Sequence, residues 1–332
     1  MQEILPGCGL YLLPLHTAVL CSRKSTAANL ESVLTKKKLL WSAFAIMLAI
    51  VALIQFIPAA PLLIPVQLPE NQRAAHRLLN FEGIANFRDL GGYATEQGQH
   101  VKWGALYRSG TFARSSRGDL QGLQKLQLSA LIDFRSSMEK EEEPNFLPDP
   151  PGFTLIEIPT LDDGNKALVG EVMERVESGD FEGFDPNLAM ITANRQFATE
   201  FTPQFRQFMH AVLDAKGTPI VWHCSAGKDR TGFAAAILLR VLGVAQDVVM
   251  RDYMESKQHA LAARKNQLLL LRTFKGDEAA DKLGIMMGVE EAWLRAAFDE
   301  IDTHWGSFDT YVREGLQLSK ADIAQLQSQL LE

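Results

Sequence analysis

The sequence feature that most constrains the fold is a short loop between a predicted strand and a predicted helix. Residues 219–222 (Pro-Ile-Val-Trp) form an apolar, β-prone run that is typical of a buried strand. Residues 233–242 are rich in strong helix formers and end before Gly243, a suitable helix C-cap. Cys224 falls at the end of the strand, and Arg230 falls where the helix begins. A strand, a tight loop and a helix in this order indicate an α/β fold.

The backbone N–H groups of such a loop are expected to point at a common centre, where a helix N-terminus adds partial positive charge. A phosphate ester suits this centre, and the planar guanidinium of Arg230 can bind two of its oxygens. The same field favours the thiolate of Cys224. A thiolate beneath a phosphoryl group is a nucleophile, so the sequence predicts a cysteinyl-phosphate intermediate. The hydroxyl of Thr231 could donate a hydrogen bond to the sulfur and make it a better leaving group.

The alternative is that Cys224 is a core residue and Arg230 a solvated one, which is the commoner fate of a lone cysteine. Here five residues separate the two, and Gly227 and Gly232 permit close backbone approach. This combination favours the catalytic interpretation.

Residues 223–232, His-Cys-x-x-Gly-Lys-x-Arg-Thr-Gly, resemble the phosphate-binding loop of cysteine-dependent protein tyrosine and dual-specificity phosphatases. The Gly-Lys-Asp-Arg form is similar to the bacterial and fungal branch that includes the mycobacterial secreted tyrosine phosphatase B. The resemblance implies a central, mostly parallel sheet flanked by helices, with a helical insertion at 165–215 that could form a lid. It also implies activity on phosphotyrosine, often on phosphoserine or phosphothreonine, and on phosphoinositides, without cofactor or metal. The loop residues expected to bind the phosphate are Ser225, Ala226, Gly227, Lys228 and Thr231.

Further motifs of the same branch lie outside the loop. Residues 86–92 and 106–109 match its opening motifs, and Arg88 and Arg108 would then shape the pocket. Residues 81–93, 101–109 and 130–135 read as strands. Asp133 and Arg135 share one face at the end of the last of these, where parallel α/β sheets carry their ligand crevice. They either contact substrate or form an internal ion pair that supports a loop.

Proton donation to the leaving oxygen requires a positioned acid. Asp229, inside the loop, is the first candidate, as the branch resemblance also suggests; its alternative role is that of a carboxylate that stabilises the N-terminus of the helix. Asp162 is the second candidate, in a polar loop that follows the predicted strand 153–158. Segment 189–195, where many cysteine phosphatases carry their acid, has no carboxylate.

Lys228 would place a second cation at the mouth of the pocket. In the phosphatases that the loop resembles, a lysine here accompanies activity on inositol phospholipids, although a solvated surface lysine is the commoner case. His223 is expected to hold the loop through hydrogen bonds.

The composition excludes several classes of protein. The 332 residues carry a net charge of −7, which disfavours a nucleic-acid partner. The chain has three cysteines, Cys8, Cys21 and Cys224, so its main body holds neither a disulfide framework nor a cysteine-rich zinc site.

The N-terminus has its own pattern. Residues 39–57 are almost continuously apolar and directly follow three lysines, which predicts a transmembrane signal anchor with a cytoplasmic N-terminus. A cleaved signal peptide and a buried helix are the alternatives. The predicted organisation is a cytoplasmic segment at 1–38, the anchor at 39–57, a linker at 58–75 and a catalytic domain at 76–332. That domain would lie on the periplasmic or extracellular side of a bacterial membrane.

These observations predict a metal-independent phosphomonoester hydrolase, in the first place a protein-tyrosine phosphatase with possible dual specificity. The alternatives are a phosphoinositide phosphatase and, from another class, a pseudo-enzyme that binds phosphorylated partners. A sulfur-transfer domain also uses a cysteine on an anion-binding loop, but the Arg-Thr-Gly ending and Lys228 disfavour it.

Overall fold

The computed structural model describes residues 36–50, 61–160 and 163–332. The chain divides into two units, Met1–Ala60 and Pro61–Glu332. Residues 36–50 of the first unit form a helix whose side chains are exposed.

The predicted membrane anchor is wrong on this structure. Among the described residues, no helix combines the length and the apolar character needed to cross a membrane. Residues 51–57 of the predicted anchor lie outside the described part. The predicted single-pass membrane localisation depended on this helix and is corrected with it.

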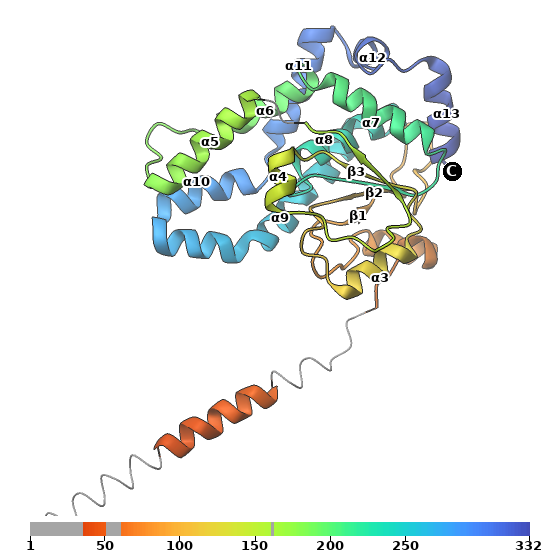
Figure 1. The fold of residues 1–332 in the computed structure, drawn as a ribbon. Helices are drawn as coiled ribbons and strands as arrows, with labels where there is room; N and C mark the ends of the chain where they lie inside the picture. Colours follow the sequence, from red (N-terminus) through yellow and green to blue (C-terminus); the bar gives the residue numbers. More distant parts are fainter. Residues whose placement is uncertain (1–35, 51–60, 161–162) are drawn as a thin grey trace, which may run out of the picture. The chain divides into compact units, whose positions relative to one another are not determined.

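The second unit is built on a five-stranded sheet whose strands are β1 (Arg88–Asp89), β2 (Leu106–Ser109), β3 (Ala130–Asp133), β4 (Thr154–Glu157) and β5 (Ile220–His223). The strand order is β1-β2-β5-β3-β4, and β1 at one edge is antiparallel to β2 (Figure 1). The remaining pairs are parallel, with β5 between β2 and β3. The sheet is therefore mostly parallel and flanked by helices, in agreement with the sequence-based prediction.

The helices of this unit are η1 (Pro65–Gln67), α2 (Glu70–Arg73), η2 (Ala74–His76), α3 (Arg117–Lys125), α4 (Ser137–Glu142), α5 (Asp163–Ser178), α6 (Pro186–Ala198), α7 (Thr202–Asp214), α8 (Asp229–Val241), α9 (Gln246–Lys275), α10 (Asp277–Met287), α11 (Glu291–Trp305), α12 (Phe308–Thr310), η3 (Tyr311–Gly315) and α13 (Lys320–Leu330). The predicted insertion at 165–215 is helical; its role as a lid stays a prediction.

The first two predicted strands are much shorter than expected, because Asn86 (φ 57°) and Gly104 (φ 78°) take left-handed conformations that interrupt the extended chain.

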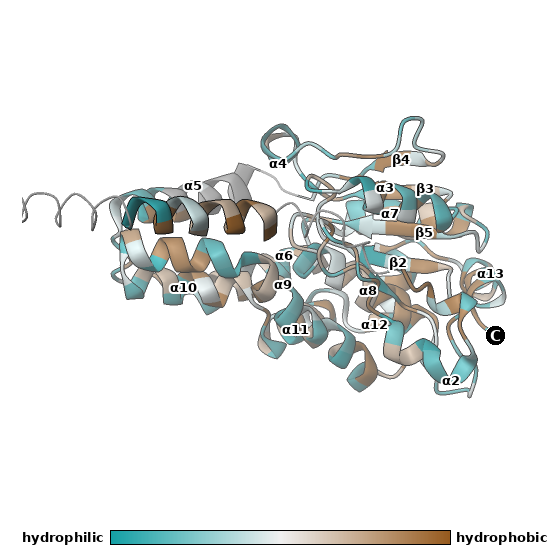
Figure 2. Ribbon diagram, turned by 90° about the horizontal axis from the view of Figure 1, so that it is seen from below, coloured by the Kyte–Doolittle hydropathy of each residue, from teal (hydrophilic) through white to brown (hydrophobic). Residues whose placement is uncertain are grey.

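Alternation along the strands creates a core on each face of the sheet. Ile220 and Trp222 of β5 face the larger core with α7, α8 and α11, whereas Val221 faces a smaller core with α3. α3 and α8 accordingly lie on opposite sides of the sheet (Figure 1). Figure 2 shows hydrophobic residues in β5 and hydrophilic residues on α4, which follows β3.

A third, separate apolar cluster holds α5, α6, α10 and the distal part of α9 together. Phe181, Phe184 and Leu283 form its buried centre. Figures 1 and 2 both show α5 and α10 extending beyond the sheet. The phosphate-binding loop lies at the other end of α9, beside the sheet, where the parallel strands end.

Candidate active site

Cys224 occupies the position that the sequence predicts, directly after the central strand β5. Its side chain is 3% exposed and packs in the larger core. The loop that follows runs from Ser225 to Lys228, and α8 begins at Asp229. Because β5 pairs in parallel with strands on both sides, the loops after β2 and β3 converge on the same edge of the sheet. The backbone N–H of Thr111, after β2, accordingly donates to the carbonyl of Ser225 at 3.2 Å.

The loop turns sharply at Gly227, which adopts φ 68°. A Cβ at this position would lie 2.4 Å from the carbonyl oxygen of Ser109, at the end of β2. The side-chain amide of Asn86 and the guanidinium of Arg108 donate to the Gly227 carbonyl at 2.8 and 2.9 Å. The turn therefore depends on a residue without a side chain.

Gly227→Ala is expected to destabilise the protein more than an alanine at a glycine that has a positive φ but no close neighbours. Gly98 is the matched control, because it has φ 85° but nothing within 4 Å of an added Cβ. We expect Gly98→Ala to lower the free energy of unfolding by about 1 kcal/mol, and Gly227→Ala by at least about 2 kcal/mol more because of the backbone clash. Urea unfolding measures both, and equal losses would contradict the close approach.

Arg230, in the first turn of α8, is held by a carboxylate to which the sequence motifs assign no role. Its guanidinium donates to both oxygens of Glu139, Nη1 to Oε2 at 2.8 Å and Nη2 to Oε1 at 2.7 Å. The hydroxyl of Ser225 donates to Glu139 Oε1 at 2.5 Å. Glu139 lies in α4, three residues after its N-cap Ser136, and forms a capping box with it. This geometry fixes the plane of the guanidinium.

The charges of this pair stabilise each other. Burial alone would raise the pKa of Glu139, but the hydrogen bonds and charge of Arg230 and the Ser225 hydroxyl outweigh burial and hold that pKa at about 2. Burial likewise disfavours the charged form of Arg230, and Glu139 together with the Cys224 sulfur outweighs it and raises the Arg230 pKa. A raised pKa on the arginine and a lowered one on the glutamate mean that both remain charged at neutral pH.

Glu139→Gln is expected to lower thermal stability at neutral pH and to matter progressively less in acid. The folded-state pKa of about 2 lies below the ordinary 4.5, so the stabilisation is complete above that value and is lost as the pH falls towards 2. We expect Tm to fall by roughly 2–4 °C at pH 7, with the gap to the parent closing by pH 2–3. Glu142→Gln, at an exposed position of the same helix, is the control. A gap that is constant with pH would contradict the ion pair.

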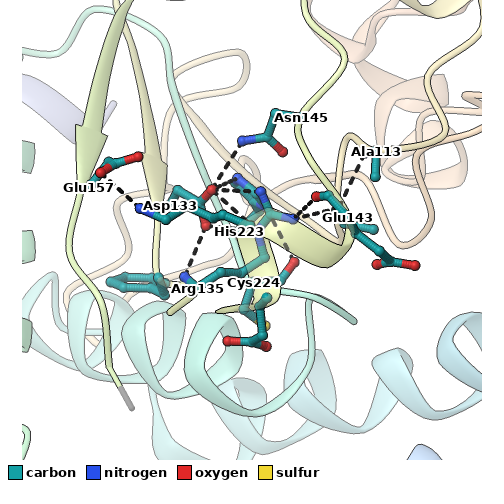
Figure 3. A network of polar contacts seen from close by, with 12 residues as sticks. Ala113, Asp133, Arg135, Glu143, Asn145, Glu157, His223 and Cys224 are labelled. Carbon is teal, nitrogen blue, oxygen red and sulfur yellow. Dashed lines mark hydrogen bonds and ion pairs between the residues drawn. The ribbon is translucent and has the colours of Figure 1, made fainter. Parts of the chain in front are cut away.

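Asp133 and Arg135 form a fully buried ion pair at the end of β3 (Figure 3). Arg135 donates to the Asp133 carboxylate through Nε (3.0 Å) and Nη2 (2.8 Å), and to the carbonyl of Glu143 through Nη1 (2.6 Å). His223 places Nε2 3.3 Å from Asp133 and Nδ1 3.2 Å from the Cys224 carbonyl. Burial raises the pKa of Asp133, but His223 and Arg135 outweigh it and lower that pKa below its usual range. The network ties β3 to the start of the phosphate loop.

Arg88 and Arg108 lie beneath the loop, both completely buried. Arg108 donates to Asp252 of α9 at 2.6 Å, and Arg88 lies 3.4 Å from the same carboxylate. Because Arg108 also binds the Gly227 carbonyl, Asp252 is joined to the loop through a single guanidinium. Burial raises the pKa of Asp252, but the charges of the two arginines outweigh it and lower that pKa.

Lys228 is less accessible than the sequence suggests. Its side chain is 8% exposed, its Nζ lies 2.5 Å from Asp229 Oδ2, and it sits over the ring of Trp293 at 5.1 Å. The other oxygen of Asp229 accepts a hydrogen bond from the hydroxyl of Tyr253 at 3.2 Å. The predicted second cation and the predicted acid are therefore in direct contact.

A cavity of about 540 Å³ opens between segment 78–86 and α9 and reaches the loop at Ser225 and Ala226. Phe81 and His259 are among its lining residues. Burial, and then the charges of Arg88 and Arg108, lower the pKa of His259, so this imidazole is neutral at pH 7. The cavity is therefore partly aromatic and adjoins the loop that follows Cys224.

Comparison with known proteins identifies this arrangement. The model of the tyrosine phosphatase family matches residues 79–332, which include the whole sheet and the loop. The chain belongs to the tyrosine phosphatase family. It is therefore an enzyme, a phosphoric monoester hydrolase of the protein-tyrosine-phosphatase type.

Relatives of this tyrosine phosphatase include a Cupriavidus necator protein whose name assigns it provisionally to the tyrosine-protein phosphatases. It is 37% identical over 253 residues, 76% of this chain and 88% of the relative. The triple specificity protein phosphatase PtpB of Mycobacterium tuberculosis is 29% identical over 276 residues, 75% of this chain and 97% of the relative. Among solved structures, P. aeruginosa TpbA aligns with 59% of this chain and 96% of its own at 15% identity, with a TM-score of 0.30, too low to support an argument.

For two residues predicted for this phosphatase site, Asp162 and Thr231, the structure shows no contact that corresponds to the predicted role. Asp162, the second candidate acid, lies outside the described residues. The Thr231 hydroxyl is buried and has no hydrogen-bond partner among the described residues, so its predicted bond to the sulfur is not formed here. Among those residues there is also no group of three or more His, Cys, Asp or Glu side chains placed to hold a metal ion.

Sequence reasoning gave no role to Glu139, Asp252, Tyr253 and Trp293 of this phosphatase. A local signal existed for Glu139, since Ser136-x-x-Glu139 is a capping box directly after the predicted strand that carries Asp133. Asp252 and Tyr253 could have been noticed as polar groups on the buried face of α9.

Proposed function

We propose that this phosphatase hydrolyses phosphomonoesters through a cysteinyl-phosphate on Cys224, with Arg230 binding the phosphoryl oxygens and Asp229 as the acid. The Cys224 sulfur attacks phosphorus and the bond to the leaving oxygen breaks as that oxygen takes a proton from Asp229. Water then attacks phosphorus, Asp229 recovers a proton from it, and the S–P bond breaks to release phosphate. The observation that carries the proposal is the loop itself, with Cys224 after β5 and Arg230 at the start of α8.

The remaining loop residues bind the phosphate in this scheme. Ser225, Ala226 and Gly227 contribute backbone N–H groups, and the N-terminus of α8 adds positive potential. Arg230 is already oriented by Glu139, so little rotamer freedom is lost when phosphate arrives. Asp133 and Arg135 act as a structural pair that supports the loop rather than as substrate contacts, since both are completely buried and paired with each other.

Phosphotyrosine is the first proposed substrate. The cavity that reaches the loop at Ser225 and Ala226 is also lined by Phe81, so a phenyl phosphate can enter along a partly aromatic wall. Phosphoserine, phosphothreonine and phosphoinositides form the second candidate set, favoured by Lys228 and by the name of the mycobacterial relative. Lys228 is engaged by Asp229 and Trp293, which favours the first candidate.

The test is a substrate panel of phosphotyrosine, phosphoserine and phosphothreonine peptides and soluble phosphoinositides, with Cys224→Ser as blank. We expect the highest kcat/KM on phosphotyrosine peptides, and turnover that is unaffected by EDTA because no metal ion takes part in the scheme. A preference for inositol phosphates that is lost in Lys228→Ala would favour the second candidate. Loss of all activity with EDTA would overturn the mechanism.

Asp229→Asn is expected to slow turnover most where the leaving group is poor. For an alkyl or unsubstituted phenyl phosphate we expect a loss of about 10²–10³-fold in kcat/KM, because a strongly basic oxygen leaves slowly unless protonated. For p-nitrophenyl phosphate the loss should be about tenfold or less. Asp162→Asn is the parallel variant. If Asp162→Asn makes kcat/KM depend more steeply on the basicity of the leaving group and Asp229→Asn does not, Asp162 is the acid.

A further inference from the structure

Tyr253 is a buried tyrosine of α9 that touches the phosphate loop at one atom. Its hydroxyl donates to Asp229 Oδ1 at 3.2 Å, and the residue is 1% exposed. α9 begins only at Gln246, after α8 has crossed the core, so this contact joins two helices at the loop.

The ring of Tyr253 is fixed by its surroundings. It packs directly against the backbone of α8, since a Cβ on Gly232 would lie 2.7 Å from Tyr253 Cδ2. The preceding residue, Asp252, binds Arg108 at 2.6 Å, and Arg108 binds the Gly227 carbonyl at 2.9 Å. α9 is therefore attached to the loop on both sides of Asp229, so the direction of the hydroxyl is determined by packing.

The hydroxyl of Tyr253 stays protonated and can therefore always donate its hydrogen bond to Asp229. Burial, and then the neighbouring charge of Asp229, raise the pKa of Tyr253 well above its usual value. The phenol consequently keeps its proton at any pH at which the enzyme works. The second carboxylate oxygen of Asp229 contacts Lys228 Nζ, so the two oxygens have different partners.

We propose that Tyr253 is a positioning residue for the reaction, whose hydroxyl holds Asp229 Oδ1 and leaves Oδ2 as the oxygen that carries the transferred proton. The proposal rests on the proposed function, in which Asp229 is the acid. Lys228 releases Oδ2 when a phosphate dianion in the adjacent loop attracts its ammonium. The proton then passes from Oδ2 to the leaving oxygen as the P–O bond breaks, and Tyr253 keeps its own proton throughout.

The consequence is specific to the leaving group. Without the Tyr253 hydroxyl, the Asp229 carboxyl can rotate. Fewer of the conformations of the enzyme–substrate complex then place the Asp229 proton within reach of the leaving oxygen. Substrates that need protonation should suffer, and substrates with a good leaving group should not. A tyrosine that merely supports the fold would affect both equally.

The experiment compares Tyr253→Phe with the parent protein on p-nitrophenyl phosphate and on phenyl phosphate. We expect kcat/KM to fall about tenfold or more on phenyl phosphate and about threefold or less on p-nitrophenyl phosphate. Tyr311→Phe is the matched control, because Tyr311 is also completely buried but lies in η3. Equal losses on the two substrates, or the same pattern in Tyr311→Phe, would overturn the proposal.

A double variant separates this proposal from the proposed function. In an Asp229→Asn background, Tyr253→Phe should have no further effect that depends on the leaving group. If Asp229→Asn itself leaves that dependence unchanged, the assignment of the acid fails. If Asp229→Asn steepens it and Tyr253→Phe does not, the positioning role alone fails. Tungstate affinity, measured by thermal shift, verifies that each variant retains a folded loop.

Discussion

Cys224→Ser is expected to lower kcat on an aryl phosphate by about 10⁴-fold or more, to the level of a blank. A serine hydroxyl stays protonated at neutral pH and is a poor nucleophile, whereas the thiol at the end of β5 interacts with the charge of Arg230. Removal of a nucleophile typically costs an enzyme this much, because the remaining groups only bind and orient the substrate.

The same variant should still bind oxyanions. The substitution leaves Arg230, Glu139 and the loop backbone in place, so the thermal shift caused by tungstate should persist. Cys8 and Cys21 are the other two cysteines of the chain, so Cys8→Ser with Cys21→Ser serves as a control for general thiol loss. Undiminished turnover in Cys224→Ser, or loss of turnover in the control, would contradict the assignment of the nucleophile.

Arg230→Ala is expected to have the second largest effect, a loss of about 10²–10³-fold in kcat/KM. In the proposed mechanism the guanidinium supplies donors to the phosphoryl oxygens, and removal of one such donor group commonly costs this much. Arg230→Lys should recover part of the loss, because a point charge remains without the planar pair of donors. Arg251→Ala, at an exposed arginine of α9, is the control.

Glu139 makes this prediction sharper. In Arg230→Ala the Glu139 carboxylate loses its partner and repels the incoming phosphate, so part of the loss comes from this repulsion. Adding Glu139→Gln to Arg230→Ala should therefore restore tungstate binding by about threefold or more. If the second substitution weakens binding further, Glu139 does not face the phosphate site.

The loop could be predicted from sequence because its signals are local. Cys224, Arg230 and the glycines between them lie within one strand–loop–helix unit, and Gly227 does adopt the positive φ that a tight turn needs. The capping box of Ser319 and Asp322 at the start of α13 is equally local, since its two residues are three positions apart.

The partners of the loop could not be predicted in the same way, because the chain brings them from a distance. Glu139 reaches Arg230 across 91 positions, and Tyr253 reaches Asp229 across 24. Their roles depend on the order of the strands and on where α9 crosses α8. Lys228 was expected at the pocket mouth, but the tertiary packing of Trp293 and the adjacent carboxylate of Asp229 remove most of its exposure.

The membrane anchor illustrates how composition can mislead. The apolar run at 39–57 and its lysine flank are the usual signals, yet they state only that a span is possible. Among the described residues, which include 36–50 but not 51–57, no helix is long and apolar enough to form one.

The most direct test of the account is to trap the covalent intermediate. Asp229→Asn should still form cysteinyl-phosphate from p-nitrophenyl phosphate, whose leaving group needs no proton, but should hydrolyse it slowly because no carboxylate accepts the proton of the attacking water. After an acid quench during turnover, mass spectrometry should find one phosphoryl group on the peptide that contains Cys224, and none in Cys224→Ser. A phosphoryl group on another residue, or turnover with no phosphoenzyme in either the parent protein or Asp229→Asn, would contradict the mechanism.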